Sequence, residues 1–467
     1  MGKKSWWTNP DIGNGICTDA DGNVFITGYF EAPTITFDSL ILTSAGNIDV
    51  FTVKYDTNGN AVWAKSMGGA SGDYSSGITA DISGNVIITG YFLSSTITFG
   101  SSILTNAGAA DIFVAKYDNL GNELWAKSAG GVSDQVPSDI STDVGGNLFI
   151  SGSFMGSTIA FGNFILTNAN SNSHEDIFIA KYDASGNVLW AKSAGGSSDE
   201  ACSGICTDAN SNVLITGFFD SPTIVFGGFT LISAGHSETF ITKYDSLGNV
   251  LWTRNADTSL YEDIGRSIST DANGNVFVTG HFSGPTITFD NVTLNNTVNS
   301  GYQDIFVVKY DASGNILGGK STGGTDNDDS FDIATDLNGN AFITGGFSSP
   351  TITFGITSLT NSSANQYDFF IAKSNCITTG FEVLNNSQYI KIYPNPFSTQ
   401  TVLRTGETLK DATLYIYNSF GQQVKQIKNI SEQEIVLQRE NLPSGLYFIH
   451  LMQDSKTIAT NKLIIVD

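Results

Sequence analysis

The segment Thr18-Asp-Ala-Asp-Gly-Asn-Val24 decides the fold, because near-copies of it return along most of the 467-residue chain. A second string, Lys-Tyr-Asp-x-x-Gly-Asn, begins at Lys54 and recurs with the same spacing, and a third, Thr-Ile-x-Phe, ends at Phe37 and recurs likewise. The aspartate that opens the first string stands at Asp19, Asp81, Asp143, Asp208, Asp271 and Asp336. Three motifs that share one period of 62 to 65 residues indicate six structural repeats.

Each repeat is expected to consist of short strands joined by tight turns. An Asp-x-x-Gly-Asn string predicts a hairpin turn, because the aspartate oxygen can accept backbone N–H groups and the glycine can adopt a positive φ. In the first repeat the apolar runs predict strands at residues 15–19, 24–30, 49–55 and 61–66, with a smaller hairpin over residues 34–43. Each repeat is therefore predicted to form two main hairpins and one small one.

Four-stranded antiparallel units that repeat radially form a β-propeller, whereas a linear β-solenoid is the alternative. The sixth repeat stops after its third strand, at Lys373. The chain begins with Lys3-Lys4-Ser5, which resembles the outer-strand sequence Lys65-Ser66. The predicted fold is all-β: a six-bladed β-propeller closed by an N-terminal strand, in which residues 4–7 pair with residues 368–373, followed by a small β-sandwich.

These motifs resemble the bacterial β-propeller repeats known as SBBP repeats, on residues 19–28 and their five copies. The resemblance covers roughly residues 5–376. The family pattern implies seven blades, whereas six repeats are countable here.

The last part of the chain differs in composition. From residue 381 the repeat is absent, and acidic and basic residues are equal in number, so the net charge of −23 belongs to the repeats. Apolar runs at residues 413–418, 434–438, 445–451 and 462–466 predict a small sandwich. The expected domains are residues 1–376, a linker at 377–388, and residues 389–467.

This segment resembles the type A C-terminal sorting domain of the type IX secretion system. The resemblance rests on four motifs in order, which include Tyr393, Pro394, Asn395, Pro396, Gly421, Gly445, Tyr447 and Lys462. It implies type IX secretion machinery as a partner and a secreted or outer cell-surface location. Residues 1–10 lack an apolar secretory signal, so we expect a signal peptide or a seventh blade upstream.

The charge and the motifs exclude several functions. A net charge of −23 disfavours nucleic acid and anionic membranes as partners, and no apolar run is long enough for a transmembrane segment. Residues 314–321 match the phosphate-loop pattern, but the sister repeats identify this stretch as an outer strand. The four histidines are dispersed, and His281 stands where sister repeats have tyrosine, which predicts a tolerated strand position. We therefore expect no enzymatic activity and no cofactor.

Other recurrent residues have structural interpretations. Calcium at the Asp19-type turns is weighed as an alternative to turn chemistry, which is favoured. The cysteines are expected to be buried free thiols. The outer-strand tryptophans are expected to pack between sheets rather than to stack on sugars, and the recurrent lysines to pair with aspartates. The tryptophans in question are Trp63, Trp125, Trp190 and Trp252.

An acidic residue recurs ahead of each expected first strand, and these residues form the candidate binding set. We expect them on one face near a central channel, either as turn caps or as a ring that gathers a cation or a cationic partner. Binding of a neutral glycan among the inserts, such as residues 31–48, is a third interpretation. The set is Asp11, Asp73, Asp134, Glu200, Asp263 and Asp328.

The predicted function is a secreted or cell-surface, non-catalytic binding or adhesion module for an extracellular glycan or protein ligand. The alternatives are a polysaccharide hydrolase or lyase on a propeller scaffold, and a structural coat component. Because the repeats are nearly interchangeable, the sequence favours multivalent binding.

Overall fold

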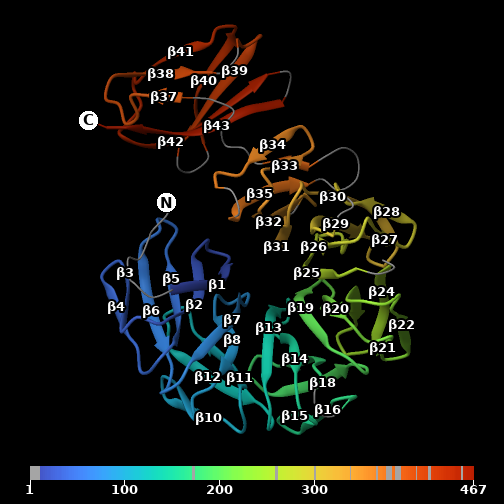
Figure 1. The fold of residues 1–467 in the computed structure, drawn as a ribbon. Coiled ribbons are helices and arrows are strands. Elements are labelled where there is room, and N and C mark those ends of the chain that lie inside the picture. Colours follow the sequence, from blue (N-terminus) through green and yellow to red (C-terminus); the bar gives the residue numbers. More distant parts are fainter. Residues whose placement is uncertain are drawn as a thin grey trace. The chain divides into compact units, whose positions relative to one another are not determined.

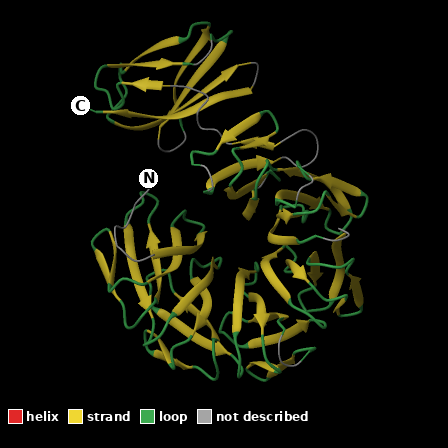
Figure 2. Cartoon of the chain, in the orientation of Figure 1, coloured by secondary structure: helices red, strands yellow, loops and turns green. Residues whose placement is uncertain are grey.

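The computed structural model describes residues 11–170, 174–257, 261–298, 301–336, 338–363, 366–374, 381–383, 391–405, 408–418, 422–453 and 456–466. It divides into two compact units, Met1–Glu382 and Val383–Asp467, which are described separately. All regular elements in the described ranges are β-strands (Figures 1 and 2). Among these residues there is no helix that could span a membrane.

Each repeat of the first unit forms an antiparallel sheet of the same strand order, and the first repeat shows the pattern. Its sheet runs β1-β2-β5-β6, while β3 and β4 form a separate hairpin. The prediction of two main hairpins and one small hairpin is confirmed. The bounds are β1 Asp11–Thr18, β2 Val24–Phe30, β3 Thr34–Phe37, β4 Leu40–Thr43, β5 Asp49–Tyr55 and β6 Ala61–Met67.

The later repeats supply equivalent strands, which we call inner, second, third and outer by their order in the sheet. The inner strands are β7 Asp73–Ala80, β13 Gln135–Thr142, β19 Glu200–Thr207, β25 Asp263–Thr270 and β31 Asp328–Thr335. The second strands are β8 Val86–Phe92, β14 Leu148–Phe154, β20 Val213–Phe219, β26 Val276–Phe282 and β32 Ala341–Phe347. The third strands are β11 Asp111–Tyr117, β17 Asp176–Tyr182, β23 Glu238–Tyr244, β29 Asp304–Tyr310 and β35 Asp368–Ser374.

The outer strands and the small hairpins complete these repeats. The outer strands are β12 Glu123–Ala129, β18 Val188–Ala194, β24 Val250–Asp257 and β30 Ile316–Thr322. The small hairpins are β9 Thr96–Phe99 with β10 Ser102–Thr105, β15 Thr158–Phe161 with β16 Phe164–Thr167, β21 Thr223–Phe226 with β22 Phe229–Ile232, β27 Thr286–Phe289 with β28 Val292–Asn295, and β33 Thr351–Phe354 with β34 Thr357–Thr360. In the fourth repeat β24 also pairs with β27, so that sheet has six strands.

The inner strand is longer than the sequence predicted. In the first repeat it begins at Asp11 instead of residue 15, and its pairing with β2 shifts between Gly13 and Gly15. The same shift occurs in each of the other five inner strands. A β-bulge interrupts the alternation of side chains, which is why the hydrophobic pattern hid the first half of the strand.

Neighbouring sheets pack face to face. Ile112 and Val114 on the third strand of the second sheet share a core cluster with Ile140 and Ile150 of the third sheet. A strand that is covered on both faces has apolar residues in succession instead of in alternation. The sequence of β11 has this pattern, and all of its residues are buried.

The first and sixth sheets differ from the others because each has one uncovered apolar face. Ile16 on β1 is 67% exposed, whereas the equivalent isoleucine of every other inner strand is 4–7% exposed. Phe369 on β35 is 83% exposed, whereas its apolar equivalents, such as Ile112 and Ile177, are 0–1% exposed. In the other repeats, the equivalent faces are buried by packing against the neighbouring sheet.

The fourth place in the sixth sheet is taken by β36 Phe381–Val383, next to β35. The sequence had assigned this place to residues 4–7, which lie outside the described residues. The strand that follows the sixth repeat therefore occupies the position expected for the N-terminal one.

The second unit contains two antiparallel sheets over one core. The sheets run β37-β38-β41 and β40-β39-β42-β43. Leu403 and Leu437 from the first sheet share a core cluster with Leu414, Ile449 and Leu463 from the second. The strands are β37 Lys391–Tyr393, β38 Gln400–Arg404, β39 Ala412–Asn418, β40 Gln423–Ile430, β41 Glu434–Gln438, β42 Gly445–Gln453 and β43 Lys456–Ile465.

Candidate functional site

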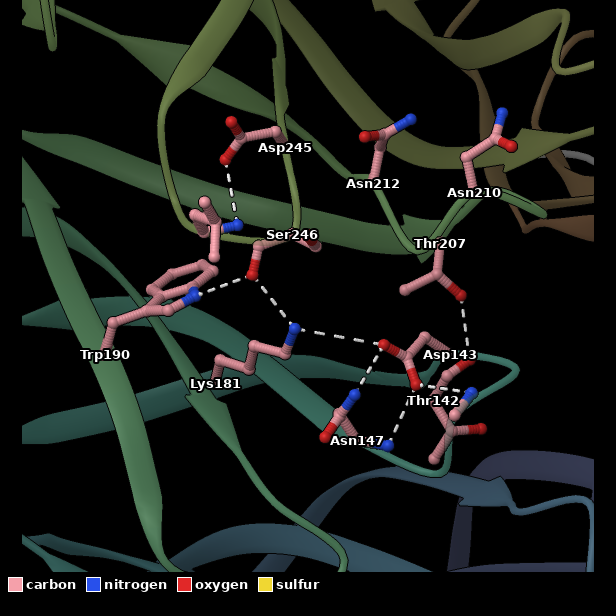
Figure 3. Close-up of polar contacts among 12 residues, drawn as sticks. Thr142, Asp143, Asn147, Lys181, Trp190, Thr207, Asn210, Asn212, Asp245 and Ser246 are labelled. Carbon is pink, nitrogen blue, oxygen red and sulfur yellow. Dashed lines mark hydrogen bonds and ion pairs between the residues drawn. The ribbon is translucent and has the colours of Figure 1, made fainter.

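The recurrent third-strand lysines join adjacent sheets. Lys181 Nζ lies 3.9 Å from Asp143 Oδ2 and donates to the Ser246 carbonyl of the next sheet at 3.0 Å (Figure 3). Lys116 makes the equivalent contacts, at 2.8 Å to Asp81 and 3.4 Å to the Ala184 carbonyl. The prediction that these lysines pair with aspartates is confirmed, so they are structural and not available to a ligand.

The aspartates of these turns are saturated by hydrogen-bond donors. Asp19 Oδ1 accepts from the backbone N–H groups of Asp21 and Asn23, and Oδ2 accepts from Asn23 Nδ2 at 2.8 Å. At Asp81, burial alone would raise the pKa, but hydrogen bonds from Lys116 and Asn85 outweigh it and hold the pKa below its usual value. N–H and ammonium donors occupy the positions that a calcium ion would need, so this geometry fits turn chemistry.

The outer-strand tryptophans pack between sheets, as predicted. Trp190 Nε1 donates to the same Ser246 carbonyl at 3.2 Å, and its ring joins a buried core cluster (Figure 3). Trp63, Trp125 and Trp252 make the equivalent hydrogen bonds.

The acidic candidate set does not surround an open channel. Asp73, Glu200, Asp263 and Asp328 are the first residues of their inner strands and are completely buried. Asp73 Oδ2 accepts from Gly69 N at 2.7 Å and from Ser94 Oγ at 2.9 Å. Glu200 and Asp328 accept from the equivalent backbone N–H groups. These carboxyls cap the loops that enter their strands, and Asp11, the first residue of β1, is half-buried.

Asp134 does not belong to this set. The residue equivalent to Asp73 in the third repeat is Gln135, which begins β13 and is completely buried. Gln135 Oε1 accepts from Gly131 N at 2.9 Å, as the carboxyls do in the sister loops. Asp134 is exposed and lies one residue outside the strand. The misassignment arose because an acidic residue happens to precede the glutamine.

Burial raises the pKa values of these carboxyls. The pKa is raised to about 6 in Asp73 and Asp328 and to about 7 in Glu200, in each case mainly by desolvation. Like charge on Asp49, Asp176 and Asp304 of the preceding sheets adds to the effect. A buried carboxyl that resists ionisation is poorly suited to gather cations.

The first unit instead contains a cavity of about 450 Å³ that all six inner strands line. Its wall is formed by the fourth and fifth residues of these strands, next to the bulge. The fourth residues are Asn14, Ser76, Ser138, Ser203, Arg266 and Phe331. The fifth residues are Gly15, Gly77, Asp139, Gly204, Ser267 and Asp332, of which all but Gly204 line the cavity.

The repeats are not interchangeable at this cavity, in contrast to their turns and cores. Desolvation raises the pKa of Asp139 to about 7, and the charge on Asp332 raises it further. These two carboxyls on the cavity wall are therefore close enough to influence each other. Arg266 Nη2 lies 3.2 Å from Asp329 Oδ2. Sequence reasoning missed this wall because it requires the bulge, which sets which inner-strand residues face inward.

His281 is also more than a tolerated strand position. It is completely buried, and its Nδ1 lies 2.8 Å from Asp329 Oδ1, on the carboxylate that also holds Arg266. In the sequence, the only sign of this role was that His281 replaces the tyrosine found at the equivalent position, as in Tyr29 and Tyr91. The cluster fixes Arg266 at the wall of the cavity.

The cysteines are free where the structure describes them. Cys17, Cys202 and Cys206 have no disulfide, and burial raises the pKa of Cys17 and of Cys202 to about 12. Cys376 lies outside the described residues.

The sorting motifs meet in the second unit. Asn395 Nδ2 donates to the Lys462 carbonyl at 2.9 Å, and Asn395 Oδ1 accepts from Ile464 N at 2.8 Å. Pro394 O accepts from Thr401 Oγ1, and Tyr447 Oη donates to Pro443 O at 2.8 Å. These contacts tie the start of the domain to its last strand. Tyr393 ends β37, Pro396 follows Asn395, and Gly445 begins β42, while Gly421 lies outside the described residues.

Comparisons with known proteins give one family match. Residues 391–466 match the secretion system C-terminal sorting domain family. The chain is 26% identical to an uncharacterized WD repeat-containing protein of Acanthamoeba polyphaga mimivirus, over 91% of this chain and 37% of that protein. It is 22% identical to regulatory protein FlaEY of Caulobacter vibrioides, over 30% of this chain and 15% of that protein. The chain thus spans only 37% and 15% of the lengths of these two curated relatives.

Solved structures offer distant likenesses. PorZ, a surface component of the type-IX secretion system of Porphyromonas gingivalis, aligns over 98% of this chain and 74% of its own, at 11% identity and a TM-score of 0.26. A fungal alcohol oxidase of the AA5 family, in complex with copper, aligns over 98% and 99%, at 11% identity and a TM-score of 0.33.

The sheet pattern of the first unit is propeller-like. Residues 391–466 are a type IX secretion system C-terminal sorting domain, and the chain is therefore a protein secreted to the cell surface.

Proposed function

We propose that this protein is a non-catalytic binding or adhesion module that the type IX system displays at the cell surface, with its ligand site in the central cavity. The observation that carries this proposal is the broken symmetry of the cavity wall. The turns and the inter-sheet contacts repeat nearly unchanged, whereas the wall combines Arg266, Phe331, Asp139 and Asp332 with small residues. Because all six repeats share one fold, the residues that differ between repeats at this one surface are not needed for folding. We therefore assign them to ligand binding.

We also propose that the six sheets are six blades of a closed propeller of the SBBP repeat type. The uncovered faces of the first and sixth sheets support closure, because Ile16 and Phe369 stand where other repeats form sheet-to-sheet contacts. Because β36 fills the fourth place of the sixth sheet, the proposed closure rests on packing of the first sheet against the sixth and not on residues 4–7. An exposed apolar end is unfavourable for a repeat protein in water, and closure removes it.

The experiment screens the purified full chain against extracellular glycans and proteins by biolayer interferometry, with product analysis in parallel. Ser203→Trp fills the cavity wall and is expected to abolish binding. Ser193→Trp, on the exposed part of β18, is the matched control and should bind as the wild type does.

The outcomes separate the functions. Binding without turnover, lost in Ser203→Trp alone, supports the module. Turnover of a bound polysaccharide would overturn it in favour of the hydrolase or lyase. Equal binding by both variants would place the site outside the cavity.

A further inference from the structure

The inference concerns the class of ligand that the central cavity accepts, and it rests on the proposed function of a binding module. The cavity volume of about 450 Å³ lies within the range of small-molecule sites. The polar groups and the one aromatic ring on the cavity wall determine which class of ligand the cavity can bind.

The first feature is a row of hydroxyls. Ser76, Ser138 and Ser203 occupy the same position in three consecutive sheets and line the cavity. None of these hydroxyls has a hydrogen-bond partner among the residues that the structure describes. Each hydroxyl can both donate and accept, so the row suits a ligand that does the same.

The second feature is a set of fixed acceptors. Asp332 Oδ1 accepts from Ser267 Oγ at 2.7 Å and from Ile333 N at 2.9 Å, which orients the carboxylate and leaves Oδ2 for a ligand. Asn14 Nδ2 donates to the Ser75 carbonyl at 2.6 Å, which leaves Asn14 Oδ1 as an acceptor. Asp139 is held by the backbone N–H groups of Ile140 and Ile205. Acceptors held in this way recognise ligand hydroxyl groups.

The third feature is an aromatic ring. Phe331 is 57% exposed and lines the cavity at a position where the sister strands carry asparagine, serine or arginine. Gly346 lies against this ring, since a Cβ atom there would lie 3.4 Å from the Phe331 ring, which is ordinary contact distance, and 3.0 Å from the Tyr367 ring. The equivalent residues in other second strands include Tyr29, Tyr91 and His281. The sixth sheet thus carries glycine next to the Phe331 ring, where several sister strands carry a bulky side chain.

Together these features select a polyhydroxylated ligand with an apolar face. An anionic ligand is disfavoured by the carboxyl of Asp332, and the one cation on the wall, Arg266, is already paired with Asp329. A purely apolar ligand is disfavoured by the row of serines. A pyranose ring has C–H groups on one face, which can stack on an aromatic ring, and hydroxyls around its edge. We propose that the central cavity binds a sugar unit of a neutral glycan, stacked on Phe331 and hydrogen-bonded by the serine row and Asp332.

The test measures binding of the full chain to immobilised neutral glycans, with polyuronates, polyamines and peptides as parallel arms. Phe331→Ser carries the residue found at the equivalent position of three sister strands, so it should fold normally. We expect it to weaken neutral-glycan binding about tenfold or more, a loss typical of removing a stacked aromatic. Phe331→Tyr should retain binding. Phe229→Ser, an exposed phenylalanine on the β21–β22 hairpin, is the matched control and should leave affinity unchanged.

The arms distinguish the two proposals. Neutral-glycan binding that Phe331→Ser weakens and the control does not supports the sugar site. Phe331-dependent binding of a polyamine, polyuronate or peptide overturns the sugar class but keeps the binding module. Glycan binding that is indifferent to Phe331 overturns the site. No cavity-dependent binding in any arm overturns both.

Discussion

Lys116 Nζ lies 2.8 Å from Asp81 Oδ2 inside the second sheet, with both side chains only 5–6% exposed. The same ammonium reaches the Ala184 carbonyl of the third sheet. One lysine therefore ties a hairpin turn to its own strand and to the next sheet, and this contact recurs through the first unit. It explains why the sequence repeats lysine and aspartate so strictly.

The first prediction removes this lysine. Lys116→Met leaves Asp81 buried without its cation, and we expect the free energy of unfolding to fall by about 3 kcal/mol, the usual cost of breaking one side of a buried pair. Lys127→Met, on the exposed part of β12, is the control and should change stability by less than about 0.5 kcal/mol. Chemical denaturation measures both. A loss for Lys116→Met as small as that of the control would show that the buried Lys116–Asp81 ion pair contributes nothing to stability.

The second prediction concerns pH. Burial raises the pKa of Glu200 from 4.5 to about 7, so the folded protein holds a proton that the unfolded chain releases. The stability from this group is complete below pH 4.5 and is lost as pH rises towards 7. Glu200→Gln cannot ionise, and Gln135 shows that glutamine fits this position. We expect the variant to match the wild type near pH 4.5 and to exceed it by roughly 1–3 kcal/mol at pH 8.

Thermal melts across this pH range provide the measurement. The corresponding substitution at an exposed acid of the repeats, Asp21→Asn, should show no rising advantage. A constant difference between Glu200→Gln and the wild type would contradict the raised pKa.

The third prediction tests ring closure. If the first and sixth sheets pack together, Ile16→Ser and Phe369→Ser each remove a buried contact and should destabilise the protein by about 2 kcal/mol. Ile103→Ser is the control, because Ile103 is equally exposed but lies on the β9–β10 hairpin. Variants at Ile16 and Phe369 that melt like the control would mean that the ring is open.

The fourth prediction concerns the two units. They should fold separately, because the described residues of the second unit have a core cluster of their own and form a compact unit. Limited proteolysis is expected to cleave within residues 377–388 and to leave two resistant fragments. A single fragment that resists cleavage there would indicate one cooperative domain.

Most of the architecture could be predicted from the sequence because its signals are local. Asp-x-x-Gly-Asn turns fix each hairpin, and their period fixes the order of strands. The site could not be predicted, because it depends on the bulge between Gly13 and Gly15 and its sister positions, which changes which inner-strand residues face inward. Without that shift Phe331 and Asp332 looked ordinary, whereas Asp134 was chosen in place of Gln135 because an acidic residue happens to precede the glutamine.

The stoichiometry of ligand binding tests the central claim most directly. Isothermal titration of the full chain with a soluble oligosaccharide taken from the best glycan should give one site per chain, lost in Phe331→Ser, because the six inner strands share one cavity. A stoichiometry near six, or one site that Phe331→Ser leaves intact, would contradict the account and return binding to the repeated surfaces.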